Sequence, residues 1–168
     1  MTVLVFSDSH GITRNLLRAA KAHAGKADAV LHLGDGAPDL HLISGLFPGV
    51  PFYPVRGNCD PAYDCEGPLP RDRVVTLGSH RLYLCHGDLH SVSRGWDSLV
   101  RDARSQSADI ALYGHLHIAE ERYFPPASDG GAVHVFSPGS ISLPRDGSPS
   151  YGLLLLSGGD VLFSVGRL

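Results

Sequence analysis

The sequence predicts an α/β fold whose β-sheets contain both parallel and antiparallel strands. Short apolar runs alternate with helical patterns in the first third of the chain, an order typical of parallel strands joined by right-handed crossovers. In the second half, strand-like runs follow one another across short turns, as in β-hairpins. Neither a repeat nor a low-complexity linker divides the chain, so we expect residues 1–168 to form a single domain.

Three strands are expected in the first third. The β-branched apolar run at 2–6 (TVLVF) predicts a buried strand, and the run at 29–33 (AVLHL) predicts a second. A third candidate at 51–55 (PFYPV) is weakened by its prolines.

Two helices are expected between these strands. Apolar residues at i+4 spacing predict a helix over 12–24. A short helix should follow the second strand, with Pro38 near its start and Leu40, Ile43 and Phe47 on one face.

The second half of the chain reads mainly as strands. They are expected at 73–77, 80–84, 109–113, 119–124, 132–136, 151–156 and 161–165. Gly78 and Ser79 separate the first two of these runs as a two-residue hairpin turn. The one clear helix of this half covers 93–104 and carries Trp96 on its apolar stripe, where a core position is favoured over substrate stacking.

Composition narrows the class of protein. With 43% hydrophobic and 18% charged residues, the chain is typical of a globular protein rather than a disordered one. A formal charge of −3 and the lack of a Lys/Arg run argue against binding of long nucleic acids, but leave a small phosphate-bearing substrate open.

Other features favour a cytoplasmic protein without a membrane anchor. Cys59, Cys65 and Cys85 are odd in number and form no C-x-x-C pair, which favours a reducing compartment. No apolar stretch approaches the ~20 residues of a membrane span. The first strand has no basic segment before it, so we expect no signal peptide.

Side chains that can bind a metal follow five of the expected strands, each at the carboxyl end. They are Asp8 and His10; Asp35; Asn58, followed by Cys59 and Asp60; His86; and His115 and His117. An isolated H-x-H pair such as His115 and His117 is more often a pair of surface histidines. Ligands of open α/β sheets, however, bind outside the carboxyl ends of the strands, so five such sets in order indicate one common site.

The donor types indicate which ions could bind. Mixed imidazole and carboxylate donors suit Mn²⁺, Fe²⁺, Zn²⁺ or Ni²⁺. Seven donors are too many for one tetrahedral ion and suit two ions that share a bridging ligand, as in two-metal phosphatases and nucleases.

At these residues the chain resembles the calcineurin-like metallophosphoesterase superfamily, whose pattern is D-x-H, G-D, G-N-H/C-D/E, H and G-H-x-H. Its small prokaryotic phosphodiesterases of the YfcE type carry G-N-C-D, as residues 57–60 do here. The resemblance covers nearly the whole chain. It implies a four-layer αββα sandwich of two mixed β-sheets flanked by helices, with a dimetal site at the sheet edges.

The resemblance also implies a role for each ligand-type residue. The first ion would be held by Asp8, His10 and His117, and the second by Asn58, His86 and His115, with Asp35 bridging both. Catalytic roles would fall on Asn58, Cys59 and Asp60, the last as an acceptor that fixes the tautomers and orientation of the ligands.

The implied activity is hydrolysis of small phosphodiesters by a hydroxide bound to two divalent transition-metal ions, with Mn²⁺ favoured. One alternative is a phosphomonoesterase that uses the same site. Another is a non-catalytic protein-binding scaffold that resembles the vacuolar sorting subunit of retromer. The partner would be a small phosphate ester, and the oligomeric state is left open, a homo-oligomer included.

Three positions depart from the family pattern. Asp88 stands where many small members have the second histidine of H-G-H, and Ser137 stands where N-P-G-S has asparagine. Cys59 replaces the histidine of larger members, so we expect leaving groups to depart without a strong general acid. If a histidine donates the proton instead, His90 and His134 are the first candidates.

The remaining histidines receive structural interpretations. His32 lies inside an apolar strand, so it should be a core histidine or a neighbour of the ligands. His23, His41, His80, His90 and His134 are expected at the surface or in packing.

Overall fold

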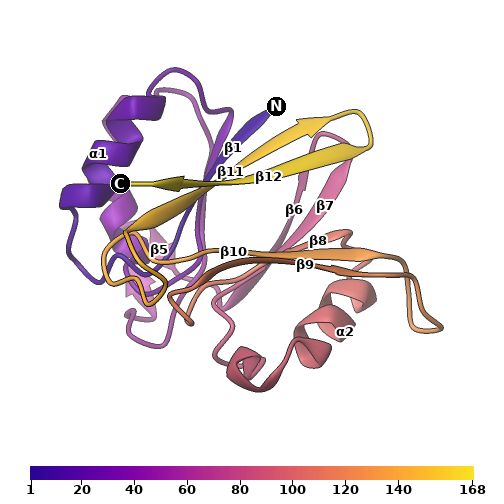
Figure 1. Cartoon of the computed structure of the whole chain (residues 1–168). Coiled ribbons are helices and arrows are strands. Elements are labelled where there is room, and N and C mark those ends of the chain that lie inside the picture. The colour runs from indigo at the N-terminus through magenta and orange to yellow at the C-terminus, as the bar shows by residue number, and fades with distance from the viewer.

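Two five-stranded β-sheets face each other in the computed structural model, which describes residues 1–168 (Figure 1). The first sheet has the order β12-β11-β1-β2-β3 and the second has the order β6-β7-β8-β10-β9. The first sheet comprises β1 (Thr2–Phe6), β2 (Ala29–His32), β3 (Phe52–Pro54), β11 (Ser150–Ser157) and β12 (Asp160–Arg167). The second comprises β6 (Asp72–Leu77), β7 (His80–Cys85), β8 (Ile110–Leu112), β9 (Ala119–Phe124) and β10 (Val133–Pro138).

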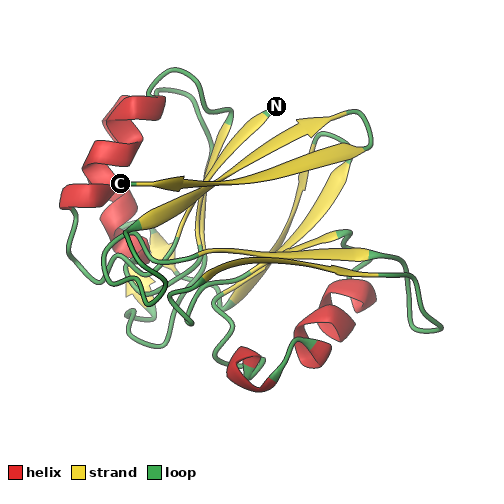
Figure 2. Cartoon of the chain, viewed as in Figure 1, coloured by secondary structure: helices red, strands yellow, loops and turns green.

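Helices cover the outer faces of both sheets, as the colouring in Figure 2 makes clear. The helix α1 (Arg14–His23) packs on the first sheet and α2 (Asp97–Ser105) packs on the second. Side chains alternate along β1, so Val5 enters the core between the sheets while Leu4 packs beneath α1. The predicted four-layer αββα architecture is confirmed.

Strand direction brings the carboxyl ends of several strands to one end of the sheets. In the first sheet β1, β2 and β3 are parallel, and in the second β7, β8 and β10 are parallel. The hairpins β6–β7 and β11–β12 supply antiparallel pairs, the first of them around the predicted Gly78-Ser79 turn. The proline-containing β3 is an edge strand, the position in a sheet that tolerates proline.

The first helix is shorter than the predicted 12–24. It begins at Arg14, and Ile12 is 48% exposed outside it. The cause is the backbone of His10 and Gly11, whose φ angles of 48° and 74° are left-handed and cannot belong to an α-helix. Helix formation is delayed so that His10 can lie in a tight turn.

The short second helix is replaced by two 3₁₀ segments, η1 (Ala37–Leu42) and η2 (Ser44–Leu46). They still bury Leu40, Ile43 and Phe47, the three residues expected on one face.

The helix expected at 93–104 begins later, at Asp97, after the 3₁₀ segment η3 (Val92–Arg94). Gly95 separates η3 from α2, because its φ of 138° is incompatible with a helix. The indole N–H of half-buried Trp96 donates to the Tyr113 hydroxyl, consistent with packing rather than stacking on a substrate.

A two-stranded hairpin, β4 (Tyr63–Asp64) with β5 (Gly67–Pro68), was not expected, because strands of two residues carry no periodic pattern. None of the helices combines the length and the apolar character that a membrane span requires.

Candidate metal centre

The loops that follow β1, β2, β3, β7 and β8 meet at one end of the two sheets. Within the first sheet, the N–H of Asp8 donates to the Gly34 carbonyl at 3.0 Å. Within the second, the N–H of Gly114 donates to the His86 carbonyl at 3.0 Å. The N–H of His115 donates to Asp8 Oδ2 at 3.1 Å and so joins the two sheets. The strand-end residues that the sequence pointed to therefore lie in one place.

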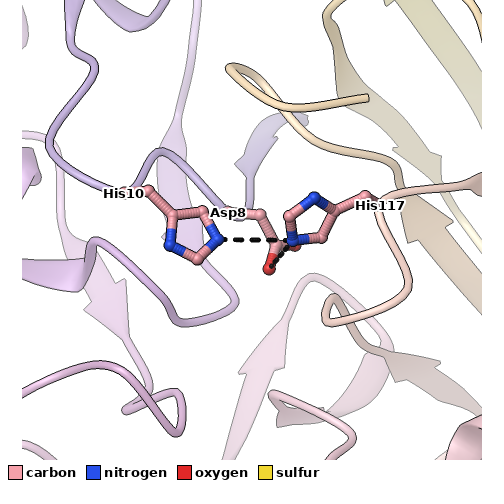
Figure 3. A group of neighbouring side chains, drawn as sticks. All are labelled: Asp8, His10 and His117. Carbon is pink, nitrogen blue, oxygen red and sulfur yellow. Dashed lines mark hydrogen bonds and ion pairs between the residues drawn. The ribbon is translucent and has the colours of Figure 1, made fainter. Parts of the chain in front are cut away.

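Asp8, His10 and His117 form the first group of potential ligands (Figure 3). Nε2 of His117 lies 3.2 Å from Asp8 Oδ1 and 3.3 Å from His10 Nε2. Asp8 is fully buried, and the two imidazoles are half-buried. The donor atoms face one another over distances that a single cation could occupy.

Asn58 and His86 form the core of a second group of potential ligands. Nε2 of His86 lies 3.1 Å from Asn58 Oδ1 and 3.4 Å from Asp35 Oδ2. The ring of His115 packs edge-on against that of His86, with centroids 5.0 Å apart. His115 thus adjoins the second group but is not part of the tight clusters of donor atoms.

Asp35 lies between the two groups. Its Oδ2 is 3.8 Å from Nε2 of His10 and 3.4 Å from Nε2 of His86. Its Oδ1 accepts the backbone N–H of Cys59 at 2.8 Å. One carboxylate oxygen therefore approaches histidines of both groups, which is the position a bridging ligand requires.

Most of the potential ligands have left-handed backbones. Their φ angles are 55° at Asp8, 48° at His10, 55° at Asp35, 69° at His115 and 59° at His117. Asp and His are among the non-glycine residues that tolerate this region best, although it still costs free energy. Concentration of such residues at one point indicates a functional site, and no periodic pattern in the sequence announces it.

Two glycines allow the ligand loops to approach each other closely. A Cβ at position 57 would lie 2.0 Å from Asp35 Oδ1, and a Cβ at position 114 would lie 2.8 Å from Asp8 Oδ2. Gly57 and Gly114 are therefore required beside the carboxylates.

Serines that sequence reasoning did not single out hold the strained Asp8. The hydroxyls of Ser140 and Ser142 both donate to the Asp8 carbonyl, at 2.8 and 2.7 Å. Ser137, the departure from N-P-G-S, instead donates to the Ile118 carbonyl at 2.9 Å. The S-P-G-S stretch was the only signal in the sequence that could have pointed to these contacts.

Asp60 acts on the backbone rather than on an imidazole. Its carboxylate accepts N–H groups from Asp35 at 2.8 Å, Gly36 at 2.6 Å and Gly57 at 2.9 Å. It therefore orients Asp35 by holding the chain on both sides of the site. Ligand tautomers are fixed by other groups.

Backbone carbonyls fix those tautomers. Nδ1 of His86 lies 2.7 Å from the Leu33 carbonyl, and Nδ1 of His117 lies 2.6 Å from the Leu143 carbonyl. Because a carbonyl only accepts, both Nδ1 atoms carry a proton, and in the neutral ring each Nε2 is left with a lone pair. Both lone pairs are directed into the site.

The residues fit a cation on a further ground. Asp8 Oδ1 is a buried carboxylate oxygen that accepts no hydrogen bond. Buried charges are normally paired or coordinate metals, because an isolated one is very costly. A divalent ion would supply the missing partner for Asp8 and would separate the facing nitrogens of His10 and His117.

Without a metal, the site shifts the pKa values of its own members. Burial opposes ionisation of Asp35, but hydrogen bonds from His86 and from the Cys59 N–H outweigh it and lower the pKa of that carboxyl. Burial would lower the pKa of His86, but its hydrogen bond to Asp35 and the charge of Asp8 raise it. The close approach of Asp8 Oδ1, 3.2 Å from Nε2, likewise raises the pKa of His117. Protons and cations therefore compete for these imidazoles.

Cys59 is exposed beside Asp35, and its thiol accepts a hydrogen bond from the Asn58 amide at 3.3 Å. Partial burial, followed by the hydrogen bond to Asp35, raises the pKa of the Cys59 thiol. The thiol is thus protonated at neutral pH in the metal-free protein.

His90 and His134 lie apart from the ligand groups. Nε2 of His90 is 3.2 Å from the Tyr83 hydroxyl and 3.2 Å from an Asp102 carboxylate oxygen on α2. The ring of His134 packs between those of Tyr123 and Phe163. Both side chains are engaged in packing, the role that the sequence favours for them.

Known proteins resemble this chain in sequence and in fold. Residues 1–159 match the model of the calcineurin-like phosphoesterase superfamily domain. The probable metallophosphoesterase YsnB of Bacillus subtilis is 34% identical over 158 residues, which cover 93% of this chain and 85% of that protein. Phosphodiesterase YfcE of Escherichia coli is 38% identical over 105 residues, which cover 60% of this chain and 50% of that protein.

Solved structures with the same fold include a conserved protein of Streptococcus pneumoniae described as a "predicted phosphoesterase". It has a TM-score of 0.76 and 29% identity, with 99% of this chain and 88% of that chain covered. Vacuolar Protein Sorting 29 from Cryptosporidium parvum has a TM-score of 0.75 and 25% identity, with 99% and 91% covered.

Proposed function

We propose that this chain, which belongs to the calcineurin-like phosphoesterase superfamily, hydrolyses small phosphodiesters with the help of two divalent cations. The observation that carries the proposal is the position of Asp35, whose Oδ2 approaches His10 at 3.8 Å and His86 at 3.4 Å. A carboxylate between two groups of imidazoles is suited to bridging two ions.

Each ion has its own proposed ligands. Asp8, His10 and His117 would hold the first ion, and Asn58, His86 and His115 would hold the second. His115 is assigned to the second group because its ring packs against that of His86. The mixed nitrogen and oxygen donors favour Mn²⁺, with Zn²⁺, Fe²⁺ or Ni²⁺ as alternatives.

Two such ions, when bound, would lower the pKa of a coordinated water to about 7 and neutralise charge on phosphoryl oxygens. The protein's own residues prepare the site for this chemistry. The Leu33 and Leu143 carbonyls keep lone pairs on His86 and His117, and the Asp60 carboxylate holds Asp35 in its left-handed conformation. No strong general acid adjoins the site, since Cys59 offers only a thiol.

A groove beside the site favours a diester over a monoester. It has a volume of about 490 Å³ and is lined by Val92, Ser93, Arg94, Gly95, Trp96, Leu116, Ile118 and Glu120. Its lining residue Leu116 lies in the chain between the proposed ligands His115 and His117. Its apolar wall can accept the organic group that a diester keeps and a monoester lacks.

Removal and return of the metal test the proposal. Protein stripped with a chelator should lose activity toward bis(4-nitrophenyl) phosphate and regain it with Mn²⁺. Full activity after verified metal removal would contradict the two-ion mechanism.

A comparison of 4-nitrophenyl phosphate with its bis-ester tests the substrate class, because both release the same leaving group. A higher kcat/KM for the bis-ester is expected, and a higher value for the monoester would identify a phosphomonoesterase. Loss of both activities with two ions bound would favour the non-catalytic scaffold.

A further inference from the structure

Arg71 connects the two loops that carry the proposed ligands of the second ion. Its Nη1 donates to the Gly57 carbonyl at 3.0 Å, directly before Asn58. Its Nη2 donates to the carboxylate of Asp88, two residues after His86. The side chains of Arg71 and Asp88 are only 24% and 17% exposed, so this ion pair is largely shielded from water.

We propose that Arg71 and Asp88 are positioning residues for the second ion, which they do not touch. The guanidinium ties the loop at 57–60 to the loop at 86–88 and so keeps Asn58 Oδ1 and His86 Nε2 3.1 Å apart, preformed for binding. This inference rests on the proposed function, because it requires that Asn58 and His86 hold an ion.

The other contacts of the Asn58 loop explain why this connection matters. The Asp60 carboxylate ties the loop toward Asp35 through the Gly57 N–H, so it fixes the side of the loop that faces the bridging residue. Asn58 itself is exposed. Its amide donates to Cys59 Sγ, and the Cys59 N–H donates to Asp35 Oδ1, so these contacts also lie toward the bridging residue. The tie toward the His86 loop is the one that Arg71 provides.

Arginine is suited to this task and lysine is not. A guanidinium presents several N–H donors in a rigid, planar fork, so it can bind a carbonyl and a carboxylate at once with fixed geometry. An ammonium keeps the charge but is a point donor on a flexible stem. The pair also gives a role to Asp88, the residue at which the chain departs from H-G-H.

The first ion should depend little on this pair. Asp8, His10 and His117 lie on other loops, and the serines at 140 and 142 hold Asp8. Loss of the Arg71–Asp88 connection should therefore weaken one ion and spare the other.

Calorimetric titration of the metal-free protein with Mn²⁺ tests this inference. Arg71→Lys and Asp88→Asn should each weaken the second-site ion by about 10- to 100-fold, the usual cost of losing a group that orients a ligand. The affinity of the other ion should be little changed. Asp88→Asn keeps the shape of the side chain and serves as the independent variant if Arg71→Lys folds poorly.

Arg104→Lys is the matched control. Arg104 also donates to a carboxylate, that of Asp129, and to the carbonyls of Pro125 and Gly131. It lies at the C-terminal end of α2, near the start of β8 and thus at the opposite end of the sheet from the site. Its replacement should leave both affinities unchanged.

The outcomes separate the two proposals. A wild-type protein that binds a single Mn²⁺ would overturn the two-ion site. The positioning role alone would be overturned if the wild type bound two ions and each variant, Arg71→Lys and Asp88→Asn, either left both affinities unchanged or weakened both ions to the same degree.

Discussion

The Asp60 carboxylate accepts the backbone N–H of Asp35 at 2.8 Å and that of Gly57 at 2.9 Å, so one side chain joins the loops after β2 and β3. The N–H of Gly36 donates to the same carboxylate at 2.6 Å. Consecutive N–H groups can converge in this way because Asp35 has a left-handed φ of 55°. The hydrogen bonds that the Asp60 carboxylate accepts thus compensate for the strained backbone of Asp35, the proposed bridging residue.

Asp60→Asn should therefore impair both stability and metal binding. An asparagine side chain has one acceptor oxygen, so at least one of the three N–H groups loses its partner, at a cost of about 1–3 kcal/mol. Urea unfolding in chelator should report this loss, and calorimetry should show weaker binding of both ions, because Asp35 is no longer held.

Asp28→Asn is the control for that substitution. Asp28 also accepts a backbone N–H, that of Thr2 at 2.6 Å, but does so near the start of β1, away from the site. It should change metal binding little. If Asp60→Asn were destabilised with both metal affinities intact, Asp60 would have a structural role only.

The bridging role of Asp35 can be distinguished from that of a ligand to one ion. Asp35→Ala should reduce occupancy at both metal positions, whereas His10→Ala should mainly empty one. Elemental analysis of the purified variants after equilibration with Mn²⁺ would measure this. Loss of a single ion in both variants would contradict the bridge.

The strands and the ligand motifs were accessible from the sequence because both depend on local pattern. β1 was predicted at its observed bounds, since an apolar β-branched run of five residues has few alternatives. Asp8 and His10 were found through the end of that strand. The four-layer arrangement came from the resemblance and not from periodicity.

Features that depend on distant contacts were not accessible. The left-handed backbone of His10 and Gly11 shortened the first helix, and the i+4 apolar pattern gave no sign of it. The role of Arg71 depends on Gly57 and Asp88, which are 14 and 17 residues away in the chain. Such contacts arise only when the loops are brought together by the two sheets.

Because His32 is buried, we expect the stability of the protein to depend on pH. His32 is fully buried, its Nδ1 accepts the Gly34 N–H at 3.2 Å, and its Nε2 lies 3.1 Å from Ser9 Oγ. Burial lowers the pKa of His32 from 6.5 to about 4. Between these values the unfolded chain binds a proton that the folded protein does not, so stability falls as the pH decreases through this window, by about 3 kcal/mol in all.

His32→Asn isolates this contribution, because asparagine retains an acceptor for the Gly34 N–H and does not titrate. Free energies of unfolding in urea and chelator should be measured for both proteins from neutral pH to about pH 4. The variant should lose less stability than the wild type as the pH falls. Parallel curves would mean that His32 is not a buried neutral imidazole.

The last prediction concerns the leaving group and rests on Cys59. A well-matched general acid contributes typically 10²–10⁴-fold to the rate, but the thiol of Cys59 is a weak hydrogen-bond donor, and its raised pKa makes it a weaker acid still. Aryl phosphodiesters should therefore be hydrolysed much faster than alkyl ones. A series of diesters that differ in leaving-group pKa, with chemistry confirmed as rate-limiting, should show a steep fall in rate as that pKa rises. A nearly flat dependence would mean that another group donates the proton, and His90 and His134 would then be the first residues to replace.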